Sequence, residues 1–343
     1  MPKPGLELVG GARVSFQHLV DYLKEEGIPF YLVETRPFEQ GWLRILNPLL
    51  VIWRCLWYLR RVDVVWGNMS YGGIRLFGPV LYLLARLGRK PIVLRPFGSR
   101  LRETYDSLSG LAKWGFERTV LQADLLFLQT QSLINYFQPL SRHLAHLPTS
   151  RELPAFESEE IPRTYRKRFA FLGHLKKVKG IDEILAVWEQ LPEEYVIHLY
   201  GPIKEEQYDY LASERIIYQG VLSSREVLAK LDEYDVLLLP TYFSGEGYPG
   251  AIIEAYSLGM PVISTQWRSI PEIVLDGETG RLIAPRDSDA LLEGILGIDE
   301  VSYRKWSIQA RQQFEVCFEQ KKVLEHALEN IRKLMPLPIS EQA

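Results

Sequence analysis

Residues 235–264, DVLLLPTYFSGEGYPGAIIEAYSLGMPVIS, contain the clearest structural pattern in the chain. Two short apolar runs, residues 235–240 and 260–264, have the length and composition of strands that are buried on both faces. Between them, Pro249 suits the first position of a helix, and Gly259 suits the left-handed residue that ends one. The segment therefore predicts a β-α-β unit with a short crossover helix.

Two carboxylates flank the start of this helix. Glu246 lies in the preceding loop, and Glu254 lies one turn inside the helix on the same face as Gly250, because residues four apart are neighbours. A helix start attracts anions through its free N–H groups and its dipole. We expect a diphosphate there, with Glu254 accepting from ribose hydroxyls and Glu246 contacting a sugar beyond the phosphates. The other expected ligand contacts are Gly247, Tyr248, Pro249, Gly250 and Ala251.

The pair Glu246 and Glu254 resembles the E-x7-E signature of retaining glycosyltransferases with the GT-B fold, in the large group called family 4. The motif lies within EGYPGAIIEAYSLGMPV, and PEIVLDGETGRLIAP, residues 271–285, follows it in the family's order. The resemblance implies an α/β protein with two doubly wound Rossmann-like domains that face each other across a cleft. It also implies a C-terminal helix that returns to the first domain. The alternative is two ordinary surface carboxylates, which a helix start favours anyway.

The length and composition agree with two folded domains. The chain has 343 residues, of which 47% are apolar, and its charges are mixed. We expect domains at residues 1–160 and 161–310, with residues 311–343 forming the returning helix and a tail. Cys55 and Cys317 form no metal or disulfide pattern, which favours a reducing, cytoplasmic location. The first residues also lack the apolar core of a signal peptide.

The start of the chain fits the resembled family only in part. In that family a strand precedes a Gly-Gly loop that approaches the donor, so the resemblance makes Gly10 and Gly11 donor contacts. Almost no chain precedes them here. We therefore expect either a reduced first strand or a true start upstream of Met1. A later loop has Phe97-Gly98 where the family commonly has His-Gly, so the role of that histidine cannot be transferred.

Residues 42–61, WLRILNPLLVIWRCLWYLRR, have two interpretations. Tryptophans among aliphatic residues and arginines are typical of a helix that lies in a membrane interface. The apolar run at residues 48–53 is far shorter than the roughly 20 residues that cross a bilayer. The alternative is a helix that packs on the sheet. Residues 30–34, FYLVE, are expected to form a strand.

The charge is divided unevenly between the two halves of the chain. Residues 1–150 hold 18 Lys and Arg against 11 Asp and Glu, a net +7, whereas residues 151–343 hold 22 against 32, a net −10. The first half therefore faces something anionic. RNA-binding motifs and zinc-ligand spacings are missing, so we expect a lipid head group and no nucleic acid. A glycan or polyprenyl-linked acceptor at the inner face of the cytoplasmic membrane fits this asymmetry.

A turn after the strand at residues 168–173 provides cations. In the resembled family this turn carries an Arg and a Lys that neutralise the diphosphate; Lys179 matches the lysine, and His174 stands at the arginine position. Such cations stabilise the negative charge that builds on a departing phosphate. His174 would act protonated or as a neutral hydrogen-bond donor, and the alternative is a purely structural histidine. Gly220 and Val221 lie where the family positions the nucleotide base.

The implied reaction is transfer of a sugar from a nucleoside-diphosphate sugar to an acceptor hydroxyl with retention, in cell-surface polysaccharide or lipid-linked glycan synthesis. We expect no cofactor and no metal. Asp287-Ser288-Asp289 imitates a D-x-D metal site, but an apolar helical pattern follows, so a helix cap explains it better. Three alternatives remain: a nucleotide-sugar epimerase of the same fold, a nicotinamide oxidoreductase, and a non-catalytic membrane-surface binding protein. The sequence does not identify the sugar, the base, the acceptor or the linkage.

Overall fold

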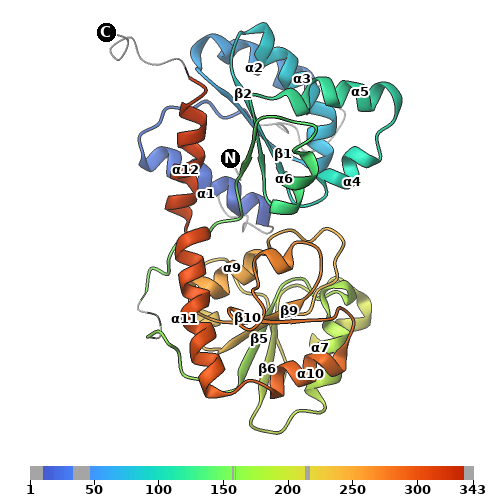
Figure 1. The fold of residues 1–343 in the computed structure, drawn as a ribbon, viewed down its shortest axis with the longest axis vertical. Coiled ribbons are helices and arrows are strands. Elements are labelled where there is room, and N and C mark those ends of the chain that lie inside the picture. Colours follow the sequence, from blue (N-terminus) through green and yellow to red (C-terminus); the bar gives the residue numbers. More distant parts are fainter. Residues whose placement is uncertain (1–10, 34–46, 157, 159, 213–216, 336–343) are drawn as a thin grey trace. The chain divides into compact units, whose positions relative to one another are not determined.

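The computed structural model contains two compact α/β units (Figure 1). The first unit contains Ala12–Leu147 together with the chain from Leu324 on, and the second contains Pro148–Val323. The structure describes residues 11–33, 47–156, 158, 160–212 and 217–335. The second unit begins earlier than the expected limit at residue 161, because Arg151 exchanges backbone hydrogen bonds with the chain around Phe318.

The first unit is built on a four-stranded parallel sheet in the order β1-β2-β3-β4. Its strands are β1 (Val65–Ser70), β2 (Ile92–Phe97), β3 (Leu125–Leu128) and β4 (Leu144–His146). Strand β3 is buried along its whole length, because its apolar run is covered on both faces. The helices of this unit are α1 (Gly11–Glu25), α2 (Asn47–Tyr58), α3 (Tyr71–Leu87), α4 (Leu101–Asp106), α5 (Gly110–Arg118) and α6 (Gln131–Phe137).

The second unit has a six-stranded parallel sheet in the order β10-β9-β8-β5-β6-β7. Its strands are β5 (Arg168–Leu172), β6 (Val196–Tyr200), β7 (Tyr218–Gly220), β8 (Val236–Leu239), β9 (Val262–Thr265) and β10 (Gly280–Ile283). The strand order reverses between β5 and β8. In doubly wound sheets ligands bind beyond the carboxyl ends of the strands at such a switch point.

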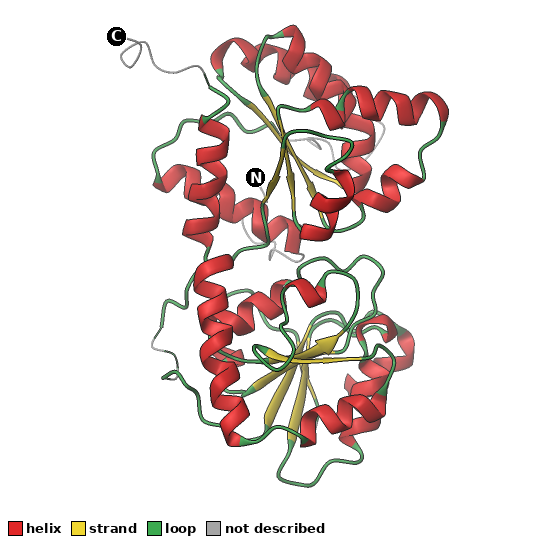
Figure 2. Ribbon diagram, viewed as in Figure 1, coloured by secondary structure: helices red, strands yellow, loops and turns green. Residues whose placement is uncertain are grey.

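Helices cover both faces of this second sheet (Figure 2). They are α7 (Ile181–Trp188), α8 (Val227–Leu231), α9 (Gly250–Ser257), α10 (Ser288–Leu296) and α11 (Glu300–Cys317). Helix α7 packs against α10, and α9 packs against α11. Asp287 accepts a hydrogen bond from the backbone N–H of Ala290 at 2.8 Å and so caps α10, as we expected from its position before the apolar pattern.

The predicted β-α-β unit is present. Strand β8 is followed by α9 and then by β9, and β8 and β9 pair in parallel with Leu237 opposite Val262. Gly259 ends the helix with a φ of 65°, as expected of a left-handed residue. Pro249 differs slightly from the prediction, since its ψ of 129° makes it the residue before the first turn instead of a member of it.

The C-terminal chain returns to the first unit. Helix α11 belongs to the second unit, whereas α12 (Gln320–Arg332) contributes its residues from Leu324 on to the first. The predicted returning helix is therefore present.

Two segments of the first unit, residues 30–33 and helix α2, do not pack as a buried strand and a core helix would. The strand predicted at residues 30–34 is not formed over its described part, and the ring of Tyr31 instead stacks on that of Tyr58 with centroids 4.5 Å apart. Helix α2 contributes little to the core, because Trp53 and Trp57 are 59% and 55% exposed. Among the described residues, no helix has the length and hydropathy to cross a bilayer.

Candidate functional site

The loops that follow β5 and β8 bring Lys179 and Glu246 together. The Lys179 Nζ atom lies 2.6 Å from Glu246 Oε2, and the two side chains are only 18% and 8% exposed. Thr241 Oγ1 donates to the same carboxylate oxygen at 2.8 Å. Glycine is required at position 180, where φ is 82° and a Cβ would lie 2.4 Å from the carbonyl oxygen of Pro240. This close approach locks the two loops against each other.

The ion pair leaves both partners able to contact a ligand. An ammonium group has three N–H donors, so Lys179 can hold Glu246 and still donate to a phosphate oxygen. A carboxylate accepts several hydrogen bonds, so Glu246 can keep Lys179 and Thr241 while it receives a sugar hydroxyl. The pair is therefore arranged to place a cation and an acceptor side by side.

A second ion pair lies at the start of α9. Arg151 Nε donates to Glu254 Oε1 at 2.7 Å, and the two side chains are 9% and 18% exposed. Another nitrogen of the same guanidinium donates to the carbonyl oxygen of Ser150 at 3.0 Å. A Cβ on Gly250 would lie 2.0 Å from Arg151 Nη2, so the guanidinium lies directly against the first turn of the helix.

Arg151 is the functional candidate that the sequence interpretation missed. It lies in a polar stretch at the beginning of the second unit that contains no motif, and it reaches Glu254 across 103 positions of sequence. A cation at a helix start is unfavourable by itself because of the helix dipole. Glu254 offsets this charge, and an anion bound beside the helix start would be attracted by both the guanidinium and the first-turn N–H groups.

The tyrosine of the motif has a structural side chain. Tyr248 donates its hydroxyl to Glu272 Oε2 at 2.6 Å, and its ring packs edge-on against Phe318 at 6.2 Å. Thr149 Oγ1 donates to the carbonyl oxygen of Tyr248 at 3.1 Å. The side chain therefore holds the loop in place, and the predicted ligand contact at this position would involve the backbone.

His174 lies after β5, at the start of the loop that carries Lys179. Desolvation lowers the pKa of its imidazole below the ordinary value, and the positive charges of three lysines add to the shift. These are Lys204, Lys176 and Lys179. The ring is therefore neutral at neutral pH, and of the two states considered for it the neutral hydrogen-bond donor is the one that the surroundings favour.

The predicted ligand contacts Val221, Gly11 and Gly10 are not among the residues that form the two ion pairs. Val221 follows β7 at the edge of the sheet, with β6 between β7 and β5, and its side chain is exposed. All strands of this sheet are parallel, so Val221 still lies at the same carboxyl edge as the two ion pairs. Gly11 is the first residue of α1, and Gly10 lies outside the described residues. Their roles as donor contacts stay predictions.

Residues 166–298 match the model of a family described as Glycosyl transferases group 1. The match lies within the second domain, which is similar to this family over these residues. The resemblance inferred from the E-x7-E region is thereby confirmed at the level of the family.

The fold is also shared with solved structures. The structure of Anabaena Alr3699/HepE in complex with UDP is 15% identical in sequence, and the match covers 96% of this chain and 98% of that one with a TM-score of 0.72. The chain therefore has the predicted GT-B fold of two Rossmann-like domains.

Curated relatives resemble parts of the chain. The putative colanic acid biosynthesis glycosyltransferase WcaL of Salmonella typhimurium is 31% identical over 170 residues, which are 44% of this chain and 41% of that protein. The putative teichuronic acid biosynthesis glycosyltransferase TuaC of Bacillus subtilis is 29% identical over 292 residues, 80% of this chain and 72% of that protein. At identities of 30–31%, the matches span only 34–41% of the relatives' length.

Proposed function

We propose that this protein transfers a sugar from a nucleoside-diphosphate sugar to a hydroxyl of a cell-surface glycan, with retention of the anomeric configuration. The observation that carries the proposal is the pair of cation–carboxylate contacts at the start of α9, formed by Lys179 with Glu246 and by Arg151 with Glu254. Similarity to proteins named as glycosyltransferases of polysaccharide biosynthesis supports the reaction class. The complex of Alr3699/HepE with UDP supports a nucleotide-sugar donor.

The geometry assigns a distinct part of the donor to each group. The diphosphate would lie at the first turn of α9, where Lys179 and Arg151 neutralise its charge. Ribose hydroxyls would donate to Glu254, which then exchanges part of its contact with Arg151 for the ligand. The sugar would donate a hydroxyl to Glu246, so the two carboxylates hold opposite ends of the donor.

The reaction then needs few protein groups. The bond between the anomeric carbon and the phosphate oxygen breaks while the acceptor oxygen bonds to the same face of that carbon. The acceptor proton passes to the departing phosphate oxygen, so no protein base is required. Lys179 and Arg151 stabilise the charge that builds on this oxygen, and we therefore propose a metal-independent reaction. Activity that is lost on chelation and restored by a divalent cation would contradict this part of the proposal.

A thermal-shift panel tests the donor. Nucleoside diphosphates and their sugars are added to the full chain, and the midpoint of unfolding is recorded. We expect one base to raise the midpoint through selective binding to the folded state, and the shift to be lost in Lys179→Ala. If no nucleotide shifts the midpoint, the proposed function is wrong. Release of an altered nucleotide-sugar without any acceptor would identify an epimerase instead.

We also propose that the first domain binds an anionic membrane surface, where a lipid-linked acceptor is extended. Four large apolar side chains of α2 are exposed: Leu49, Trp53, Leu56 and Trp57. The guanidinium of Arg61 lies 5.3 Å from the centre of a Trp57 ring. Indoles and adjacent arginines suit the boundary between head groups and acyl chains. The exposure of α2 favours this interpretation over a helix that only packs on the sheet.

Vesicle flotation tests the membrane surface. We expect binding to phosphatidylglycerol vesicles that weakens with salt, and a several-fold loss in the double variant Trp53→Ser/Trp57→Ser. Trp114→Ser in α5 is the matched control, because Trp114 is equally exposed at 59% but lies on another helix. Equal binding of all variants, or of vesicles without anionic lipid, would contradict the assignment to α2.

A further inference from the structure

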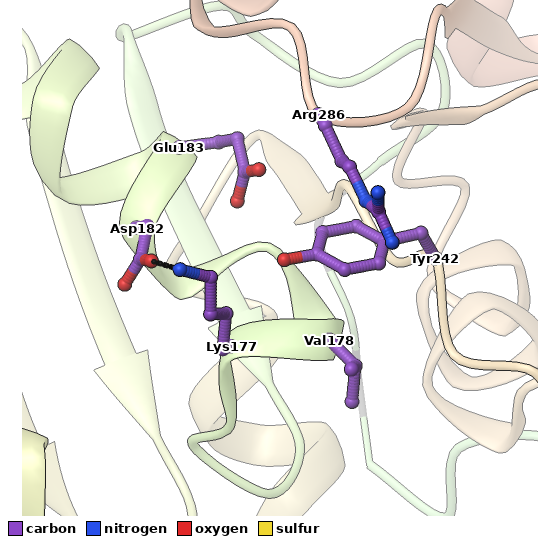
Figure 3. Close-up of a pocket in the computed structure, with 6 residues that line it drawn as sticks. All are labelled: Lys177, Val178, Asp182, Glu183, Tyr242 and Arg286. Atoms are coloured by element: carbon purple, nitrogen blue, oxygen red, sulfur yellow. Dashed lines mark ion pairs between the residues drawn. The ribbon is translucent and has the colours of Figure 1, made fainter.

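A cavity of about 470 Å³ lies in the second domain beside the candidate site (Figure 3). The residues that line it are different from those of the candidate site. It is formed by the turn after β5, the first turn of α7, the loop after β8 and the loop before α10. The residues that line it are Lys177, Val178, Asp182, Glu183, Tyr242 and Arg286. Its volume is within the range of small-molecule sites.

The most informative residue of this cavity is Glu183. The residue is only 8% exposed, and its Oε2 atom has no hydrogen-bond partner among the described residues. Figure 3 shows its carboxyl group directed toward the space shared with Tyr242 and Arg286. Burial raises the pKa of Glu183, and the charge of Asp182 adds to the effect. A buried carboxyl oxygen without a partner reduces stability, so its retention in a cavity points to a ligand that completes its hydrogen bonding.

The opposite wall is held in a fixed conformation. The guanidinium of Arg286 lies 4.6 Å from the centre of the Tyr242 ring. Arg286 has a φ of 62°, which residues other than glycine rarely adopt. The backbone N–H of Tyr242 donates to the carbonyl oxygen of Val178 at 2.9 Å, which fixes the ring's position relative to the turn after β5. The wall is therefore built before any ligand arrives.

The charged groups that line the cavity balance one another. Lys177 pairs with Asp182 at 3.3 Å, and Glu183 faces Arg286. A cation would be repelled by Lys177 and Arg286 while the carboxyl groups attract it, and an anion would experience the reverse, so neither gains a net electrostatic attraction. A neutral ligand with several hydroxyls avoids both repulsions, because each hydroxyl donates to a carboxyl oxygen or accepts from a guanidinium.

We propose that this cavity is a second carbohydrate site, which binds one neutral sugar residue separately from the nucleotide-sugar. The site goes beyond the transfer reaction proposed above, since the residues that line it differ from those assigned to the donor. A glycan residue bound here would keep a polymer attached to the second domain between successive transfers.

Ligand-observed saturation-transfer NMR tests the site on the full chain, with the methyl glycosides of glucose, galactose and mannose as probes. We expect transfer from the protein to at least one glycoside. Tyr242→Phe removes one hydroxyl and should weaken binding about tenfold, since one hydrogen bond contributes on this scale. Glu183→Leu should abolish the saturation transfer to the glycosides. Glu183→Gln keeps hydrogen-bonding atoms at this position and should retain part of the signal.

A matched variant separates the two sites. Glu254→Gln changes the donor site alone, so it should leave glycoside binding intact while weakening the nucleotide-induced thermal shift. Tyr242→Phe and Glu183→Leu should weaken glycoside binding and leave the nucleotide-induced thermal shift intact. Circular dichroism checks that each variant is folded. The proposal would be overturned if none of the three glycosides shows saturation transfer, or if Tyr242→Phe and Glu183→Leu bind them as the unchanged protein does. Preferential binding of glucuronate or glucosamine would also overturn it. A missing nucleotide shift in the unchanged protein would overturn only the proposed transfer reaction.

Discussion

The two ion pairs near the start of α9 have similar geometry but are supported differently. Lys179 and Glu246 come from loops that Gly180 and Thr241 fasten together. Arg151 and Glu254 join the first residues of the second unit to a helix, and Arg151 is held by its backbone hydrogen bonds with the chain near Phe318. We infer that the first pair is a fixed element of the site, whereas the second exchanges partners when a ligand binds.

The largest expected effect is on catalysis through the fixed pair. Lys179→Ala removes a cation that faces the departing phosphate and leaves the buried Glu246 carboxylate unpaired. We expect kcat to fall by about 100- to 1,000-fold, as for the loss of one group that stabilises transition-state charge. The measurement is the rate of nucleoside diphosphate release with acceptor present.

Lys230→Ala is the matched control for this prediction. Lys230 pairs with Glu233 at 2.6 Å on the surface, where both side chains are more than a third exposed, so its loss should not change the rate. Full activity in Lys179→Ala would show that the pair is structural.

The next effect is on stability through the exchanging pair. Arg151→Ala leaves Glu254 without its partner and should reduce the free energy of unfolding by about 3 kcal/mol, as for one half of a buried pair. The double variant with Glu254→Gln should recover part of this loss. Denaturant unfolding of both single variants and the double variant measures the coupling, and fully additive losses would mean that the two residues do not interact in solution.

A smaller effect isolates the position of the guanidinium. Gly250→Ala adds a methyl group 2.0 Å from Arg151 Nη2, so the side chain must shift and the contact with Glu254 must change. We expect nucleotide affinity to fall about tenfold, the scale of one charge-assisted hydrogen bond. Calorimetric titration measures the affinity.

Gly115→Ala is the corresponding control, because Gly115 lies in α5 and no atom of the described part of the chain is within 4 Å of an added Cβ. It should leave nucleotide affinity unchanged and stabilise its helix by about 0.5–1 kcal/mol. If Gly250→Ala binds nucleotide as tightly as this control, the site tolerates displacement of Arg151.

The smallest expected effect is a pH dependence from His174. Its folded pKa is lowered from 6.5, so the unfolded chain binds a proton first and this residue costs stability as the pH falls below 6.5. A bound diphosphate would raise the same pKa, so nucleotide affinity should increase as the pH falls from 8 to 6. His174→Gln should remove both dependences, and equal slopes in the two proteins would exclude a contact between His174 and phosphate.

Much of this architecture was readable in the sequence because it depends on local pattern. The buried strands β8 and β9 are uninterrupted apolar runs, and Gly259 has the left-handed conformation that ends a helix. Lys179 and Glu246 follow two strands of one parallel sheet, so their loops had to emerge at the same edge. The placement of Glu246 before the helix and of Glu254 inside its first turns followed from the predicted β-α-β unit alone.

The tertiary structure decided which partners these residues have. Arg151 reaches Glu254 only because its backbone is joined to the chain at Phe318, a contact between distant segments that no periodicity encodes. The strand expected at residues 30–34 is not formed over its described residues, where aromatic side chains are exposed. The sequence therefore determined the elements and their order, because these follow from hydrophobic period and turn chemistry. Only folding decided how charges are paired, because pairing depends on distances between residues far apart in the chain.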